Sequence, residues 1–154
     1  MSVAVGLVGA GVMGSEHARI LREDTPGATL AGVCDADPRR AAMAACGSPI
    51  YSNPLEMIRS NNIDAVLIAS PDATHAELVM ACLEAGKPVL CEKPLAATAK
   101  QALAIVELEM SKARRLVQVG YMRRFDLAYQ LLKESFDSGE IGKPRIVHNV
   151  HRNP

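Results

Sequence analysis

The chain has 154 residues, of which 49% are hydrophobic and 22% are charged, a composition typical of a folded domain with a substantial core. Lysine and arginine together number 17, as do aspartate and glutamate, so the charge indicates neither nucleic acid nor a membrane as a partner. The four cysteines show no CxxC or CxxxxC spacing, and no apolar run approaches the roughly 18 residues of a membrane span. Without a recognisable signal peptide, these features favour a cytoplasmic protein with reduced thiols.

The first half of the chain alternates short β-branched segments with longer helical patterns. We expect strands over residues 3–8, 29–34, 49–51 and 65–69, and helices over residues 12–22, 38–45 and 54–60. The first strand lacks polar alternation, which is typical of a parallel strand buried on both faces. Pro38 suits the first position of its helix, where its missing N–H removes no hydrogen bond.

The same alternation continues in the second half. The T-x-x-E pattern at Thr74 and the T-x-x-Q pattern at Thr98 are capping boxes, which predict two further helices. The first of these reaches Ala85 and ends at Gly86, because glycine readily adopts the left-handed conformation. The remaining expected elements are strands over 89–91 and 116–119, a helix from Thr98 to about residue 112, and a helix over 125–136. Together they predict an α/β fold, a Rossmann-type doubly wound parallel sheet of about six strands.

The last residues predict a change of domain. The turn-rich segment DSGEIGKP is followed by RIVHNVH, which is β-like but has no later strand with which to pair. We therefore expect a Rossmann dinucleotide-binding domain over residues 1–138. Residues 139–154 are expected to be a linker and the first strand of a second domain, the rest of which is missing from this sequence.

A glycine-rich turn follows the first strand directly. In the motif GAGVMG, Gly9 suits a tight turn and Gly11 suits the approach of a pyrophosphate to the backbone. Gly14 suits close packing of the helix on the strand. The N–H groups of Val12 and Met13, at the helix N-terminus, are the expected pyrophosphate donors. The position of the motif between a strand and a helix predicts a dinucleotide site.

Asp35 stands at the end of the second expected strand, where a carboxylate of this fold accepts hydrogen bonds from the adenosine ribose. A carboxylate there repels a 2′-phosphate, so NAD is favoured over NADP. Arg39 and Arg40 lie close by in the sequence and could neutralise part of that repulsion. In the alternative interpretation, the glycines only make a turn and Asp35 only caps the next helix.

The segment CEKPLA follows the strand expected over residues 89–91. It brings Glu92 and Lys93 to the carboxyl edge of the sheet, where doubly wound folds bind ligands. The Lys93 ammonium could hydrogen-bond a substrate hydroxyl and stabilise its oxygen during hydride transfer. A lysine exposed to solvent without a function is the alternative.

With these motifs, the sequence resembles the Gfo/Idh/MocA family of dinucleotide-dependent oxidoreductases. The matching segments span nearly all of the chain: GAGVMG, CDADP, SPDATHAELVMACLEAGKPVLCEKPLA and GYMRRFD. Within the family, GYMRRFD and HNVHRNP are most similar to inositol 2-dehydrogenases and related sugar dehydrogenases. The resemblance implies an NAD-dependent dehydrogenase that acts on a polyol or sugar, with a second, α+β domain and a homo-oligomeric assembly.

The resemblance also implies roles for individual residues. Lys93 is the implied catalytic lysine, joined to Pro94 by a cis peptide bond. The implied cofactor contacts are Ser70, Pro71 and Asp72, and the implied substrate contacts are Met122, Arg123 and Asn153. Further candidate cofactor contacts are His75, which follows the SPDAT loop, and Glu92 and Pro94 of the EKP segment. No metal is implied.

The sequence departs from the family pattern in one respect. Family dehydrogenases pair the lysine with an aspartate and a histidine of the second domain, and none of the four histidines here is an obvious substitute. A non-catalytic dinucleotide-binding or sensing module therefore remains an alternative. A Rossmann methyltransferase is another, although its chemistry gives no reason for EKP after a strand.

Overall fold

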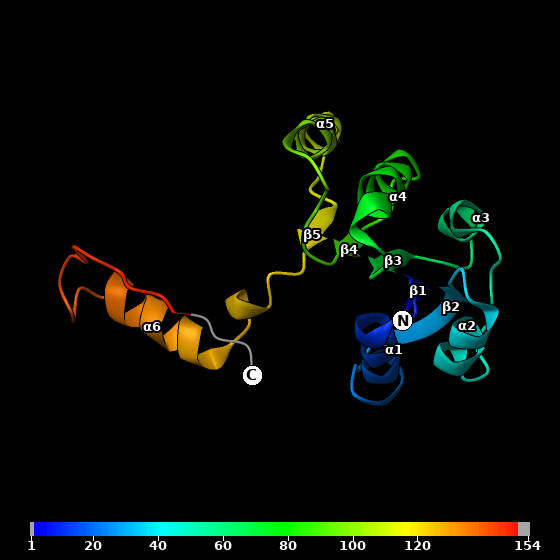
Figure 1. Ribbon diagram of the computed structural model, residues 1–154, viewed down its shortest axis with the longest axis horizontal. Helices are drawn as coiled ribbons and strands as arrows, with labels where there is room; N and C mark the ends of the chain where they lie inside the picture. The colour runs from blue at the N-terminus through cyan, green and yellow to red at the C-terminus, as the bar shows by residue number, and fades with distance from the viewer. Residues whose placement is uncertain (1, 151–154) are drawn as a thin grey trace. The chain divides into compact units, whose positions relative to one another are not determined.

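Five parallel strands form one sheet in the computed structural model, which describes residues 2–150 (Figure 1). Their order is β2-β1-β3-β4-β5, with β1 at Val3–Val8, β2 at Ala28–Cys34, β3 at Ala65–Ile68, β4 at Val89–Cys91 and β5 at Val117–Val119. The chain passes from β1 to β2 on one side and then crosses to the other side of β1 for β3. The carboxyl ends of β1 and β3 therefore flank the point of strand-order reversal, where open α/β sheets bind ligands.

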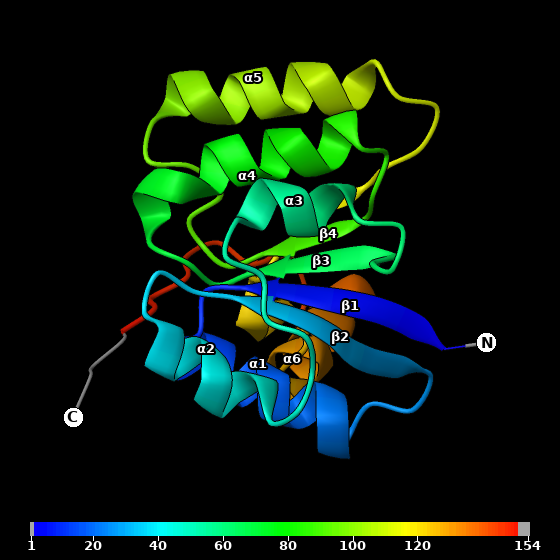
Figure 2. The same ribbon diagram turned by 90° about the vertical axis from the view of Figure 1, so that its right-hand side faces the viewer.

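Helices cover both faces of this sheet (Figure 2). One face carries α1 (Val12–Glu23) and α2 (Pro38–Ala45), and the other carries α3 (Pro54–Arg59), α4 (Asp72–Glu84) and α5 (Ala99–Met110). This arrangement confirms the predicted Rossmann-type α/β fold. Pro38 and Pro54 each occupy the start of their helix, and Asp37 and Asn53 accept hydrogen bonds from the N–H groups of the first turn.

The helices enclose an apolar core on each face of the sheet. Strand β1 contributes to both, since Leu7 packs in the cluster on the α1 and α2 side and Val8 in the cluster on the opposite side. Gly6 lies under Met57, whose Cε would be only 3.1 Å from a Cβ at this position. The prediction that the first strand is buried on both faces is thus confirmed, apart from its first two residues.

The sheet has one strand fewer than expected. Residues 49–51 form only an isolated bridge, in which Val33 N–H donates to Pro49 O and Tyr51 N–H donates to Val33 O. Pro49 has no N–H to donate, and Asn53 already caps α3, so the segment is too short to extend the ladder. The expected third strand was therefore wrong.

The two capping boxes have different outcomes. Thr98 caps α5 as predicted, because its hydroxyl oxygen accepts a hydrogen bond from Gln101 N–H. Helix α4 begins earlier than predicted, at Asp72, so Thr74 lies inside its first turn and donates its hydroxyl to Pro71 O. Gly86 follows α4 with a φ of 69°, as expected of a glycine that ends a helix.

The described residues divide after Gly120 into two units. The second unit contains the short 3₁₀ helix η1 (Met122–Arg124) and α6 (Leu127–Asp137), which Asp126 caps by accepting a hydrogen bond from Ala128 N–H. Its residues 121–150 include none that is buried. The expected domain boundary at residue 138 stays a prediction.

The strand expected over residues 145–151 is not formed in residues 145–150, and residue 151 lies outside the described residues. An extended segment needs a neighbouring strand to bond its N–H and C=O groups, and in the described part of the chain this segment pairs with none. Among residues 2–150, no helix is both long and apolar enough to cross a bilayer.

Candidate functional site

The three glycines after β1 are required for three different reasons. Gly9 has a φ of 91°, and a Cβ there would lie 2.5 Å from Ser70 N, so the turn passes directly against the end of β3. A Cβ on Gly14 would lie 1.9 Å from Gly9 O, which shows how closely α1 packs on the turn. A Cβ on Gly11 would meet no described atom within 4 Å. Only Gly11 therefore leaves free space beside its backbone, where a pyrophosphate could approach.

The N-terminus of α1 is electrostatically suited to an anion. Gly11 is its N-cap, and among the described residues no side chain caps this helix and no acidic residue lies in its first turn. The N–H groups of Val12 and Met13 lie at this end, where the helix dipole favours negative charge. The side chain of Val12 is 91% exposed, so the end of the helix is open. These features fit the predicted pyrophosphate contacts.

Asp35 joins the glycine turn to the end of β2. One of its carboxylate oxygens accepts a hydrogen bond from Ala10 N–H at 2.6 Å, and the other accepts from Asp37 N–H at 2.7 Å. The cap of α2 is Asp37, not Asp35. The interpretation of Asp35 as a simple helix cap is therefore wrong. Each oxygen retains a second lone pair, so the carboxylate can still accept hydrogen bonds from a ribose.

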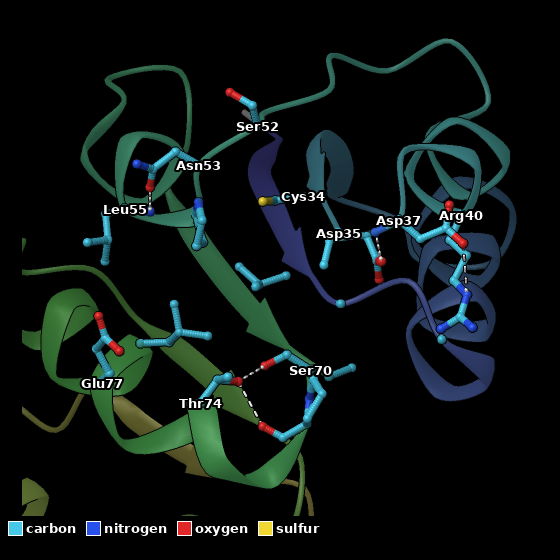
Figure 3. Close-up of a pocket in the computed structure, with 18 residues that line it drawn as sticks. Cys34, Asp35, Asp37, Arg40, Ser52, Asn53, Leu55, Ser70, Thr74 and Glu77 are labelled. Carbon is cyan, nitrogen blue, oxygen red and sulfur yellow. Dashed lines mark hydrogen bonds and ion pairs between the residues drawn. The ribbon is translucent and has the colours of Figure 1, made fainter.

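A cavity of about 950 Å³ opens at this edge of the sheet (Figure 3). Five of the predicted cofactor residues line it, namely Gly9, Gly11, Asp35, Ser70 and Pro71. The other predicted contacts are not among its lining residues: Val12, Met13, Gly14, Asp72, His75, Glu92, Lys93 and Pro94. The volume suits a cofactor, because ligand pockets commonly measure about 300–1,000 Å³.

Sequence reasoning missed several walls of the cavity. Ser52 and Asn53 come from the connection between α2 and α3, and Leu55 comes from the start of α3. Thr74 and Glu77 come from α4 (Figure 3). The Asn53-Pro54 pair could be recognised as a helix start, but nothing local indicates that it faces the glycine turn. Only the order of the strands brings these segments together.

Arg40 also lines the cavity, and its Nε lies 3.6 Å from a carboxylate oxygen of Asp37. This pairing offsets part of the positive charge that could receive a 2′-phosphate. Arg39 is exposed and is not among the lining residues. The two arginines that follow Asp35 are therefore not equivalent.

The EKP segment lies at the end of β4. The peptide bond between Lys93 and Pro94 is cis, as the family resemblance implied. Lys93 is exposed, and its N–H donates to a carboxylate oxygen of Glu92 at 3.3 Å. The other oxygen of Glu92 lies 2.9 Å from His17 Nε2. Glu92 is thus engaged by α1, a contact that sequence reasoning did not anticipate.

The buried cysteines near this edge are chemically quiet. Burial raises the pKa of the Cys34 thiol, and the neighbouring Asp35 charge adds to the effect. Burial raises the pKa of Cys91 to about 12, with a smaller contribution from Glu92. Both groups therefore remain protonated at neutral pH, a poor state for a nucleophile or a metal ligand. All four cysteines are free. No group of three His, Cys, Asp or Glu residues within 2–150 is placed to hold a metal ion.

Two of the predicted substrate residues belong to the second unit. Arg123 donates to Asp126 at 2.8 Å and its guanidinium lies 5.1 Å from the centre of the Tyr129 ring. Met122 is 57% exposed. Asn153 lies outside the described residues. A contact of these residues with substrate stays a prediction.

Comparison with known proteins agrees with this geometry. Residues 3–121 match the model of the GFO_IDH_MocA oxidoreductase family, described as having an NAD-binding Rossmann fold. Inositol 2-dehydrogenase 1 of Saccharopolyspora erythraea is 53% identical over 99% of the chain, and Inositol 2-dehydrogenase of Rubrobacter xylanophilus is 48% identical over 98% of it. The chain covers 47% and 44% of these two relatives, so it spans just under half of their length.

Solved structures give the same result. Myo-inositol dehydrogenase from Lactobacillus casei, in complex with NAD(H) and myo-inositol, matches 94% of this chain with a TM-score of 0.90 and 36% identity. This chain covers 44% of that structure. The methyltransferase alternative loses its basis, since the family model spans both the glycine turn and the EKP segment. The chain belongs to the Gfo/Idh/MocA oxidoreductase family and has its NAD-binding Rossmann fold.

Proposed function

We propose that this chain is the cofactor-binding part of an NAD-dependent dehydrogenase that oxidises a hydroxyl group of an inositol or a related polyol or sugar. The observation that carries the proposal is the convergence of the glycine turn, Asp35 and the Ser70-Pro71 segment on one cavity. The EKP segment follows the next strand along the same edge. The relatives named inositol dehydrogenases support the substrate class.

The residues of the cavity suit the parts of NAD. The open space beside Gly11 and the uncapped start of α1 suit the pyrophosphate, with Val12 and Met13 as donors. The free lone pairs of Asp35 suit the adenosine ribose hydroxyls. Ser70 and Pro71 follow β3 and line the cavity, and they would contact the other ribose and the nicotinamide, with Asp72 next in sequence. When bound, the nicotinamide supplies the acceptor for the hydride.

Lys93 supplies positive charge at this edge of the sheet. Its ammonium would donate a hydrogen bond to the substrate hydroxyl and stabilise the oxygen as negative charge develops on it. A second group must accept the hydroxyl proton, and we assign that role to the part of the protein that corresponds to the remaining half of the relatives. The substrate would also be contacted by residues that follow β5 in the sequence, namely Met122, Arg123 and Asn153.

The Asp35 carboxylate makes NAD the preferred dinucleotide, because a 2′-phosphate would face a like charge. Arg40 does not remove this preference, since Asp37 already pairs with it. A homo-oligomeric assembly, implied by the family resemblance, and a cytoplasmic location, in keeping with four free thiols, belong to the same proposal.

The test uses the complete product of the gene that encodes this chain. Calorimetric titration of NADH and NADPH measures cofactor affinity, and NAD reduction is followed with myo-inositol, scyllo-inositol and a panel of aldoses. Lys93→Ala should lower kcat by about 100-fold or more, as expected for loss of one acid–base or oxyanion partner, and should leave NADH affinity unchanged. Lys100→Ala, at an exposed lysine of α5, is the matched control.

Two outcomes would overturn the proposal. Full activity of Lys93→Ala would remove the lysine from the chemistry. Tight NADH binding without turnover on any polyol or sugar would instead indicate the non-catalytic dinucleotide-binding or sensing module.

A further inference from the structure

His75 occupies an unusual position between two loops of the site. It lies in the first turn of α4, and its side chain is 1% exposed. Its Nδ1 lies 2.6 Å from Pro94 O, and its Nε2 lies 2.8 Å from Ser70 O. Ser70 follows β3 and lines the cavity, whereas Pro94 directly follows Lys93 after β4. One imidazole thus spans the segments that follow two adjacent strands.

A polar side chain at this position needs an explanation. Within residues 2–150, His75 is the one buried polar or charged residue. The other buried side chains of α4 are apolar: Ala76, Leu78, Val79, Cys82 and Leu83. Burying a polar group is unfavourable unless it forms hydrogen bonds, so packing alone would be served better by an aliphatic side chain.

The segment that carries Lys93 has few other anchors. Over residues 93–97, the described hydrogen bonds are the 3.3 Å bond from Lys93 N–H to Glu92 and the contact of Pro94 O with His75. The next fixed point along the chain is Thr98, which caps α5. The contact with His75 is therefore the shorter of the two that hold this segment, and it is made from the protein interior.

We propose that His75 is a positioning residue that donates from Nδ1 to Pro94 O and thereby fixes the segment that carries Lys93. Its Nε2 faces the carbonyl oxygen of Ser70, a residue that lines the cofactor cavity. A carbonyl oxygen only accepts, so each contact is a hydrogen bond only when the facing nitrogen carries a proton. The shorter distance assigns the essential proton to Nδ1. The inference rests on the proposed function, because the role of Lys93 is itself a proposal.

Two conservative variants separate the two contacts. His75→Asn places its amide nitrogen near the position of Nδ1 and keeps a donor toward Pro94 O. His75→Gln places its amide nitrogen near the position of Nε2 and keeps a donor toward Ser70 O. Both variants retain a polar side chain of similar size, and thermal unfolding followed by circular dichroism identifies any variant that does not fold.

The complete gene product is assayed for kcat, for KM of inositol and for NADH affinity. His75→Gln should lower kcat by up to about 100-fold, the scale expected when a catalytic group is misplaced by about 1 Å, with little change in NADH affinity. His75→Asn should recover most of the lost kcat and should leave NADH affinity close to the wild-type value, because the donor toward Pro94 O is retained. Equal losses in both folded variants, or recovery by glutamine rather than asparagine, would overturn the assignment.

A second measurement does not depend on turnover. Hydrogen–deuterium exchange of the peptide that spans residues 92–97 should be faster in His75→Gln than in the wild type, and close to the wild-type rate in His75→Asn. If the wild-type protein has no activity, the proposed function fails while this comparison still decides the role of His75. Unchanged exchange in both variants would show that His75 does not hold the segment.

Discussion

The two units of this chain differ in how they are stabilised. The unit that ends at Gly120 pairs its five strands and encloses two apolar clusters, one on each face of its sheet. In the second unit, residues 121–150 include none that is buried, although α6 has large apolar side chains such as Leu127 and Leu131. The first unit has the interior that folding requires, whereas the second depends on local interactions such as the Asp126 cap.

This difference separates two groups of predicted site residues. The predicted cofactor residues that line the cavity, from Gly9 to Pro71, all belong to the first unit, where tertiary packing holds their loops in place. The predicted substrate residues Met122 and Arg123 belong to the second. The predicted cofactor contacts that line the cavity are therefore held by the packed fold, and the two predicted substrate contacts among the described residues are not.

The largest expected effect is on the free energy of unfolding. It is tested by truncating one aliphatic side chain to alanine in each unit. Ile68→Ala removes a fully buried side chain of β3 and should lower the free energy of unfolding by about 2–5 kcal/mol. Leu131→Ala removes a side chain of α6 that is 53% exposed and should change it by less than about 0.5 kcal/mol. Urea unfolding measures both values, and similar losses would contradict the distinction between the two units.

A second substitution tests whether the cofactor site is preorganised. Gly11→Val should weaken NADH binding by at least about 100-fold, because two hydrogen bonds to a charged group are each worth about 1.5–3 kcal/mol. The protein should still fold, since a Cβ on Gly11 meets no described atom within 4 Å. Gly14→Ala is the opposite case, because its Cβ would lie 1.9 Å from Gly9 O and should destabilise the fold. Calorimetry and circular dichroism separate the two effects, and retained affinity in Gly11→Val would exclude the glycine turn as the binding site.

Substitutions at Asp35 and Asp37 should have a more moderate effect, which is on the ratio of NADPH to NADH affinity. Asp35→Ala removes the like charge that faces a 2′-phosphate and should shift the ratio of NADPH to NADH affinity toward NADPH by about tenfold or more. Part of the NADH affinity should also be lost, because Ala10 N–H loses its acceptor. Asp37→Ala, which frees Arg40 from its partner, should shift the same ratio in the same direction. Tighter binding of NADPH than of NADH by the wild type would show that Arg39 and Arg40, and not Asp35, control the choice of dinucleotide.

The smallest effect concerns the cap of α6. The hydrogen bond from Arg123 lowers the pKa of Asp126, and the Ala128 N–H lowers it further. A lowered pKa means that the charged carboxylate stabilises the folded helix above its unfolded pKa, and that this contribution is lost as the pH falls through the folded pKa. The NMR signals of Leu127 and Ala128 should therefore report fraying of α6 on acidification. Asp126→Asn keeps the cap but does not titrate, so its helix should lack this dependence.

Much of the compact unit could be predicted from local patterns. The uniform apolar run of β1, the proline at the start of α2 and the glycine turn each depend on neighbouring residues in the chain. The errors arose at the boundaries of elements, where one or two residues decide whether a strand or a helix begins. Residues 49–51 have the composition of a strand but form one bridge, because Pro49 lacks an N–H and α3 begins soon after. Thr74 has the sequence of a cap, but α4 begins at Asp72.

The sequence by itself determined the family, the order of the main helices and strands, and the residue types that dinucleotide binding requires, since all of these are encoded in short motifs of fixed spacing. The tertiary structure decided what those residues touch. It directs the Asp35 carboxylate to Ala10 N–H, Glu92 to His17, and the ring of His75 to the carbonyl groups of two loops. Apart from the contact of His75 with Ser70, these contacts join residues that are at least 19 positions apart in the chain. They depend on the order in which parallel strands align their carboxyl ends at one edge of the sheet.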